Sequence, residues 1–350
     1  MTAKMSSRER VLCAAAHSIP DRMPLDIQTT GEAWAKLVDH YGTDDNEAVF
    51  ERLGIDIRYI GPVSRQKQAM YTDGTYDGPW GNRLRTVSHG TGAYEEVAFY
   101  PLDNTSTPEE ITAFSFPDPA VRFDYSSIAD MCHGYDAYAL IGGYASVFYV
   151  PTQVRSMEKI LLDMLLNQPM VDTLVEKALK HAIAYNEPLL AMGKGRIDFL
   201  HMADDFATQR GLLFSLDMWR RFFRKPMQVL VDMAHSYGAR VMFHCCGAAA
   251  ELIPDLIEMG IELLDPVQTS AYGMDPSVLK TAYGEKIAFH GGIDTQQTLP
   301  FGTPEQVKRE VRERIEVLGC GGGYILSPCH AVQSDVPLAN ILAVFEAALG

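Results

Sequence analysis

Short apolar runs alternate with longer stretches of helical periodicity along most of this chain. The runs lie near Leu25, Ile57, Leu140, Phe199, Met242, Leu263, Ala288 and Ile325. Between them, apolar residues recur at spacings of three and four, which predicts amphipathic helices over 8–17, 32–41, 157–166, 169–192, 216–237, 248–259, 276–283, 304–318 and 338–348. Eight strands that alternate with helices predict an α/β fold, a (β/α)8 barrel of the TIM type.

A polar, β-rich segment interrupts this alternation after the second predicted strand. Residues 61–135 contain many Gly, Thr, Tyr and Asp residues, short alternating runs, and turn signals at Asp73-Gly74 and Asp77-Gly78. We interpret this segment as an inserted β-meander of the kind that shapes a substrate site. No Gly-rich dinucleotide fingerprint follows the first strand, so we expect residues 1–350 to form a single barrel domain with this insertion.

Composition and charge narrow the choice of partner and compartment. The chain is 47% hydrophobic and 21% charged, as in ordinary globular proteins. Its formal net charge of -15 argues against nucleic acid and favours small molecules or a protein partner. Residues 1–10 lack the apolar core of a signal peptide and no apolar run is long enough to cross a membrane, so we expect a cytoplasmic protein.

Polar and metal-binding side chains follow the predicted strands. In a (β/α)8 barrel the active site lies where the strands end. The side chains at these positions are Asp26, Gln28, Tyr59, Tyr144, His201, Asp204, Asp205, His244, Cys246, Asp265, Gln268, His290, Asp294, Cys329 and His330. Several histidines and two cysteines at one rim predict a reaction centre there.

His244 and Cys246 form the most specific of these pairs. They end a buried strand and stand two residues apart, so on an extended strand both side chains leave the same face. A catalytic zinc takes three protein ligands and keeps a fourth position open. Cys329, just after the eighth strand, is the natural third ligand of an N/S₂ set.

The chain resembles the uroporphyrinogen decarboxylase superfamily, and within it the corrinoid-linked, zinc-dependent methyltransferases. The segments that carry the resemblance are 10–12, 20–24, 244–247, 264–268, 289–294, 322–326 and 335–337. The superfamily is a (β/α)8 barrel, in agreement with the strand count. Its methyltransferases carry a His-x-Cys pair, which His244 and Cys246 match.

The resemblance implies a cofactor, a partner and a set of roles. It implies Zn²⁺, with Cys329 or His330 as the third ligand, because the family's Pro-Gly-Cys-Gly pattern reads Pro-Cys-His-Ala at 328–331. It implies a methylcorrinoid (cobalamin) carried by a corrinoid-binding protein, and a small methyl donor or acceptor of the thiol, methoxy or methylamine type. Residues expected to orient the substrate or the metal are His201, Asp204, Asp205, Asp265 and His290.

Two alternatives stay open at this stage. One is a metal-free decarboxylase of a tetrapyrrole, in which His330 and aspartates hold the substrate. The segment 26–32 disfavours it, because this segment lacks the arginines with which the true decarboxylases bind the substrate's carboxylates. The other is an accessory protein that binds a corrinoid or a metal without turnover.

Overall fold

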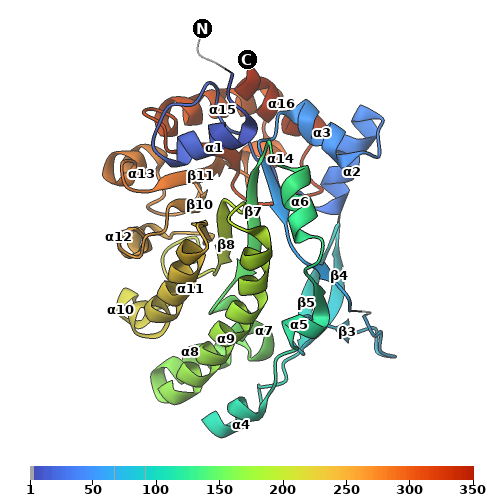
Figure 1. The fold of residues 1–350 in the computed structure, drawn as a ribbon, viewed down its shortest axis with the longest axis vertical. Helices are drawn as coiled ribbons and strands as arrows, with labels where there is room; N and C mark the ends of the chain where they lie inside the picture. The colour runs from blue at the N-terminus through green and yellow to red at the C-terminus, as the bar shows by residue number, and fades with distance from the viewer. Residues whose placement is uncertain (1–3, 67, 91) are drawn as a thin grey trace.

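A parallel sheet that curls on itself forms the centre of the molecule. The computed structural model describes residues 4–66, 68–90 and 92–350. Within these residues the main sheet has seven strands in the order β1-β7-β8-β9-β10-β11-β12. Their bounds are β1 (Ile57–Ile60), β7 (Ala139–Ala145), β8 (Phe199–Ala203), β9 (Arg240–His244), β10 (Leu263–Val267), β11 (Ala288–Ile293) and β12 (Tyr324–Pro328). Figure 1 shows this curled sheet with helices around its outer side.

The predicted first strand closes the sheet through a single bridge instead of a ladder. Leu25 pairs in parallel with Leu326 of β12, and the Asp26 amide donates to the Leu326 carbonyl at 3.0 Å. On the other side, the Asp56 amide donates to the Leu25 carbonyl at 2.9 Å, just before β1 begins. Pro24 has no N–H to extend the pairing. The predicted barrel is therefore confirmed, with all eight predicted strand positions in place and the first one reduced to a bridge.

The amino end of the barrel is closed by α1 (Ser7–Ala15). Ser6 caps this helix, and the predicted capping box with Glu9 is present. Val11 and Ala15 pack against an apolar layer inside the sheet, made of Ile57, Ala139, Ile141, Phe199, Met242, Leu263, Ala288 and Ile325. Access to the interior is thus left to the opposite end, where the strands finish, which we call the mouth.

Helices on the outer side of the sheet follow the predicted alternation. Their bounds are α2 (Gly31–Tyr41), α3 (Asn46–Leu53), α7 (Tyr149–Val154), α8 (Met157–Leu166), α9 (Gln168–Gly193), α10 (Leu216–Trp219), α11 (Lys225–Ser236), α12 (Ile253–Glu258), α13 (Pro276–Tyr283), α14 (Thr298–Phe301), α15 (Pro304–Leu318) and α16 (Leu338–Leu349). Among the described residues, no helix has both the length and the apolar character to span a membrane.

Two predicted helices differ from their expected form. The helix expected over 216–237 runs through a π-helical turn, Arg220–Arg224, which separates α10 from α11. Pro226 follows this turn and has no N–H for the regular ladder, which explains the change of pitch. The helix expected over 248–259 begins as a 3₁₀ turn, Ala250–Leu252, before α12.

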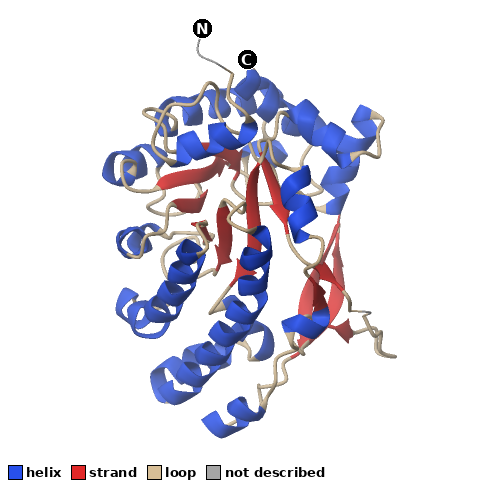
Figure 2. Cartoon of the chain, in the orientation of Figure 1, coloured by secondary structure: helices blue, strands red, loops and turns tan. Residues whose placement is uncertain are grey.

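The inserted segment follows β1 and is rich in antiparallel strands, as predicted. It forms a two-stranded sheet from β2 (Val63–Ser64) and β6 (Phe123–Asp124), and a three-stranded sheet from β3 (Tyr76–Asp77), β4 (Arg83–His89) and β5 (Gly92–Phe99). Its helices are α4 (Pro108–Ala113), α5 (Pro119–Arg122) and α6 (Ile128–Gly134). Figure 2 shows these strands beside the barrel. Two residues of the predicted insertion, 67 and 91, lie outside the described residues.

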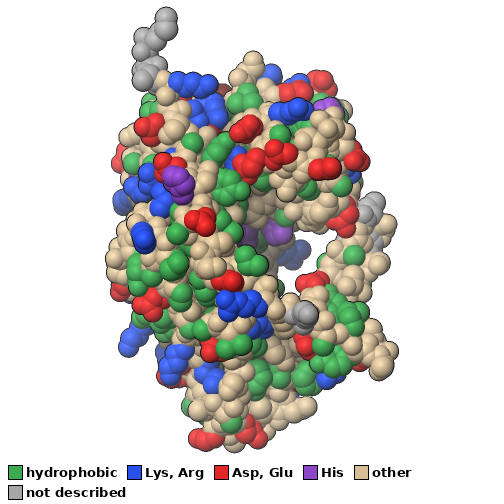
Figure 3. Space-filling model, turned by 45° about the vertical axis from the view of Figure 1, so that its right-hand side comes forward, with side chains coloured by type: hydrophobic (Ala, Val, Ile, Leu, Met, Phe, Trp, Pro, Cys, Tyr) green, Lys and Arg blue, Asp and Glu red, His purple; other side chains and the backbone are tan. Residues whose placement is uncertain are grey.

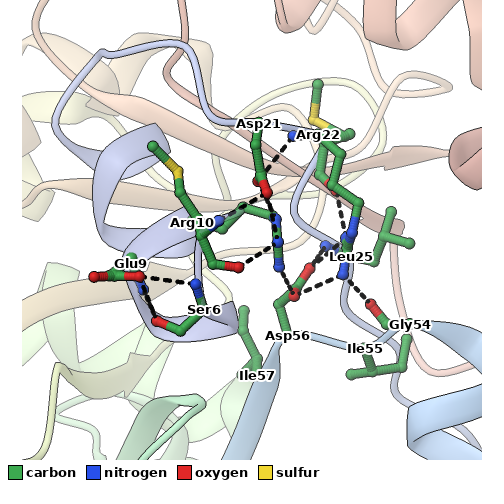
Figure 4. Close-up of polar contacts among 12 residues, drawn as sticks. Ser6, Glu9, Arg10, Asp21, Arg22, Leu25, Gly54, Ile55, Asp56 and Ile57 are labelled. Carbon is green, nitrogen blue, oxygen red and sulfur yellow. Dashed lines mark hydrogen bonds and ion pairs between the residues drawn. The ribbon is translucent and has the colours of Figure 1, made fainter. Parts of the chain in front are cut away.

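A compact ion-pair network, which we call the base network, ties the chain together at the amino end of the strands (Figure 4). It consists of Arg10, Asp21, Arg22 and Asp56. Asp56 is fully buried and accepts from Arg10 at 2.7 Å, from Arg22 at 2.7 and 2.9 Å, and from the Leu25 amide at 3.0 Å. Asp21 accepts from the other side of the Arg10 guanidinium at 2.7 and 3.0 Å. Each buried charge therefore has an opposite charge within hydrogen-bond distance.

Candidate metal centre at the barrel mouth

His244 and Cys246 lie at the mouth, where β9 ends. His244 is the last residue of β9 and stands beside Asp265 of β10 in the sheet. The chain then turns at Gly247, whose φ is +93°, and a Cβ there would lie 2.5 Å from the Thr208 carbonyl oxygen. Only glycine fits this close approach. The turn places the Cys246 thiol 3.4 Å from His244 Nε2.

His330 joins this pair from the loop after β12. One ligand atom from each of His244, Cys246 and His330 lies within 4.8 Å of the others, and we call these three residues the donor group. Cys329 does not face it, because its buried thiol donates to the Val267 carbonyl at 3.0 Å. Burial raises the pKa of the Cys329 thiol to about 12, so it stays protonated. Of the two predicted third ligands, the geometry brings His330 to the pair.

Behind His244 runs a chain of alternating carboxylates and rings, which we call the mouth chain. Its Asp265, His290 and Asp26 are buried, whereas Tyr59 at its far end is 41% exposed. Asp265 contacts His244 Nδ1 and His290 Nδ1, both at 2.6 Å, through its two oxygens. His290 Nε2 lies 3.1 Å from Asp26, which accepts from the Tyr59 hydroxyl at 2.7 Å. Because Asp265 contacts Nδ1 of His244, the Nε2 atom of His244 is the one that faces Cys246 and His330.

Charges are balanced along the mouth chain. Burial disfavours protonation of His290, but Asp265 and Asp26 outweigh it and raise the pKa of His290 to about 9. Burial likewise acts against ionisation of Asp265, yet the two histidines hold its pKa below the ordinary range. His290 is therefore a buried imidazolium between two carboxylates at neutral pH.

His201 of β8 completes the ring of histidines around the donor group. Its ring lies 6.1 Å from that of His244, and its ligand atom, with those of His244 and Asp265, forms a second group within 4.8 Å. His201 Nε2 is buried and has no hydrogen-bond partner among the described residues. Burial, together with His244, lowers the pKa of His201 to about 4, so the ring is neutral. This buried nitrogen is therefore free to pair with a water molecule, an ion or a substrate.

The two predicted aspartates after β8 have different surroundings. Asp205 accepts from the Cys246 amide at 2.7 Å and lies 3.9 Å from His244 Nε2, so it borders the donor group. Asp204 is buried and turned away from the donor group. It accepts from the Ser146 hydroxyl at 2.6 Å and from the backbone amides of 147–149 at 2.7 to 2.9 Å. Burial raises the pKa of Asp204 to about 6 although these four donors oppose the shift.

A small cavity opens beside these residues at the mouth. Its lining residues, from the first strand and from β9 to the loop after β12, are Gln28, His244, Asp265, His290, Ser327, Pro328, Cys329, His330 and Ala331. Figure 3 shows histidine side chains inside a hollow in one face of the molecule. Asp26 and Tyr59 were predicted to lie at the rim, because they follow strands. Their connection to His244 through Asp265 and His290 was not indicated by any sequence motif.

Comparisons with known proteins place this site in a family context. A uroporphyrinogen decarboxylase (URO-D) from Pseudoalteromonas translucida is 30% identical over 84 residues, which is 23% of each chain. A methylated-thiol–coenzyme M methyltransferase from Methanosarcina mazei is 25% identical over 173 residues, 49% of this chain and 42% of that protein. The chain thus spans less than half the length of these curated relatives.

A solved structure has a similar fold over nearly the whole of this chain. The structure of a methyltransferase from Methanosarcina mazei matches with a TM-score of 0.70 and 18% identity, over 98% of both chains. The family model described as uroporphyrinogen decarboxylase (URO-D) matches residues 100–349, more than half of this chain. This chain therefore belongs to the uroporphyrinogen decarboxylase (URO-D) family.

Proposed function

We propose that this chain is a zinc-dependent methyltransferase that exchanges a methyl group between a small substrate and a corrinoid carried by a partner protein. The donor group carries the proposal, because His244, Cys246 and His330 converge at the mouth. The likeness to the Methanosarcina mazei methyltransferase supports the same reading. We further propose that residues 1–350 act as one domain, with the insertion 61–135 shaping the substrate site.

The residues at the mouth fit zinc. Two imidazoles and one thiolate are ligands that Zn²⁺ accepts, and three protein ligands leave a fourth position for a substrate. A carboxylate on the far nitrogen of a ligating histidine is the common supporting arrangement, and Asp265 supplies it for His244. We propose His330 as the third ligand instead of Cys329. Zinc bound here would stabilise the deprotonated or polarised heteroatom of the substrate.

The surrounding residues hold this set in position. Asp265 fixes the ring of His244, and His290 keeps Asp265 ionised from the other side. Asp205 holds the Cys246 amide at the turn. Asp204 acts at a distance, by fixing the loop that leads into α7. His201 presents a neutral nitrogen beside His244, where it could accept a hydrogen bond from a bound substrate.

The bonds and electrons of the reaction can be followed for transfer from a methylcorrinoid to a thiol. The thiol sulfur would form the new bond to the methyl carbon, and the methylcorrinoid would keep both electrons of the broken cobalt–carbon bond. The thiol proton is released, so the site must favour the thiolate. Transfer in the opposite direction reverses each change.

Charge at the mouth argues against the alternative of tetrapyrrole decarboxylation. A substrate with several carboxylates requires cationic side chains to bind it. The lining of the mouth cavity holds no Arg or Lys among the described residues, and the His290 imidazolium that lines it is already paired with Asp265 and Asp26. Asp205 adds a further negative charge beside the donor group.

Demethylation of methylcobalamin by a simple thiol such as 2-mercaptoethanol tests the proposal. We expect the zinc-loaded protein to demethylate it, and the Cys246→Ala variant to lose about 100-fold or more of this activity. Cys320→Ala is the matched control, because Cys320 is an exposed free thiol that the site does not use. Equal activity in Cys246→Ala and Cys320→Ala would contradict the proposal.

A further inference from the structure

A largely apolar pocket, separate from the mouth cavity, lies between the insertion, the end of β7 and α9. Its lining residues are Pro79, Trp80, Phe123, Tyr144, Ser146, Val150, Ala178, His181, Ala182 and Tyr185, and we call it the aromatic pocket. Its volume is about 180 Å³. A cavity of this size holds a group as large as one aromatic ring.

The rings of the aromatic pocket are packed against one another. Trp80 meets His181 edge to face with 5.2 Å between ring centroids, and Phe123 meets Tyr185 in the same manner at 5.0 Å. Each pair joins one residue of the insertion to one residue of α9. The walls are therefore held in place by both parts of the chain, and they present ring faces and edges to a planar guest.

The aromatic pocket carries no charge at neutral pH. None of its lining residues is an Asp, Glu, Lys or Arg. Burial, aided by Arg122, lowers the pKa of His181 to about 4, and burial raises the pKa of Tyr185 to about 12. The Ser146 hydroxyl already donates to Asp204 and accepts from the Val150 amide. None of the lining residues offers a charged partner, so the pocket favours an uncharged guest.

Tyr144 joins the aromatic pocket to the metal centre. It lines the pocket, and its ring lies 6.1 Å from that of His201, which in turn lies 6.1 Å from that of His244. Ser146 makes a second connection, since its partner Asp204 directly precedes Asp205. A largely apolar pocket beside a cluster of ionisable groups is the usual form of a small-molecule site.

We propose that the aromatic pocket binds an uncharged, planar apolar group of the methyl-bearing substrate, so that this substrate is an aryl methyl ether or thioether, in which the methyl group to be transferred is bound to oxygen or sulfur. The inference rests on the proposed function for the identity of the guest. The binding itself rests only on the shape and lining of the pocket. Phe123 and Trp80 give the insertion a direct part in choosing the substrate.

Trp80 provides the readout for a binding test. The chain has three tryptophans, and only Trp80 lines the aromatic pocket. We expect methoxybenzene to change the tryptophan fluorescence of the full-length protein in a saturable manner, and expect the Trp80→Phe variant to lose that change. Benzoate, which has the same ring with a negative charge, should bind about tenfold more weakly or not at all.

Variants of α9 separate the aromatic pocket from the rest of the molecule. Ala178→Leu fills the pocket and should raise the Kd for methoxybenzene about tenfold or more. Ala191→Leu is the control, because Ala191 is exposed on the same helix. Ala182→Val is a smaller filling change if the first variant does not fold. No saturable binding to the wild type, equal binding of benzoate, or no effect of either filling variant would overturn the proposal.

The outcome for the aromatic pocket can be told apart from that for the metal centre. Binding of methoxybenzene should persist in His244→Ala, because His244 does not line the pocket. Binding without any methyl transfer would contradict the proposed function while the pocket stands as a ligand site. Methyl transfer without binding would contradict the pocket alone.

Discussion

The two ends of the barrel both bury charged networks, but only one network is complete. In the base network, the buried oxygens of Asp56 accept four hydrogen bonds from Arg10, Arg22 and a backbone amide. The mouth chain buries a similar set of charges, yet it ends at His244 Nε2, beside a thiol and two further imidazoles. Burying charge is costly at either end. A complete network holds the fold together, whereas an incomplete one marks a place for a ligand.

The base network should show the largest effect on stability. Asp56→Ala leaves Arg10 buried beside only one remaining carboxylate, so we expect the free energy of unfolding to fall by about 3–5 kcal/mol. Urea unfolding measures this change. Asp217→Ala is the control, because that exposed carboxylate lies 3.6 Å from Arg220 and its loss should cost less than about 1 kcal/mol. Similar decreases in the free energy of unfolding for the two variants would show that the base network stabilises the fold no more than a surface ion pair does.

The mouth chain should lose stability in alkaline solution. The pKa of His290 is raised to about 9, so the stability from its protonated form is fully present below its ordinary pKa of 6.5 and is lost as pH rises through 9. We expect the free energy of unfolding of metal-free protein to fall by about 3 kcal/mol between pH 6 and pH 10. His290→Gln should have a smaller slope, since only His244, whose pKa Asp265 also raises, would then contribute to it. An equal slope in the variant would show that His290 is neutral in the fold.

The base network should fail in acid, at the opposite end of the pH range. A hydrogen bond from Arg10 lowers the pKa of Asp21 to about 2, so its contribution is present above about pH 4 and is lost as pH falls toward 2. We expect the stability difference between wild type and Asp21→Asn to shrink by about 2 kcal/mol across that window. Urea unfolding at several pH values measures it, and a constant difference would contradict the assignment.

The main frame of the fold could be predicted from local pattern. All eight strand positions follow from apolar runs that alternate with helical stretches. Parallel strands buried on both faces are nearly continuous runs of apolar residues, so they can be recognised in the sequence. The π-helical turn at Arg220–Arg224 and the reduced first strand could not be predicted in this way. They depend on how Pro226 and Pro24 affect hydrogen bonding within a formed sheet and helix.

The candidate site was predictable only where its residues are neighbours in sequence. The spacing of His244 and Cys246 predicted their pairing, and the structure places them 3.4 Å apart. The contact between His290 and Asp26 joins residues 264 positions apart and exists only because the barrel closes. The choice between Cys329 and His330 depends on which way each side chain leaves the end of β12, and spacing does not reveal that direction.

Zinc content is the most direct test of the incomplete network at the mouth. We expect about one zinc per chain in protein purified without chelator, and expect its loss in both His244→Ala and Cys246→Ala. Cys329→Ala should keep the metal, whereas His330→Ala should lose it as the other two ligand variants do. Wild-type protein without zinc, or loss of zinc in Cys329→Ala with retention in His330→Ala, would contradict the metal centre proposed here.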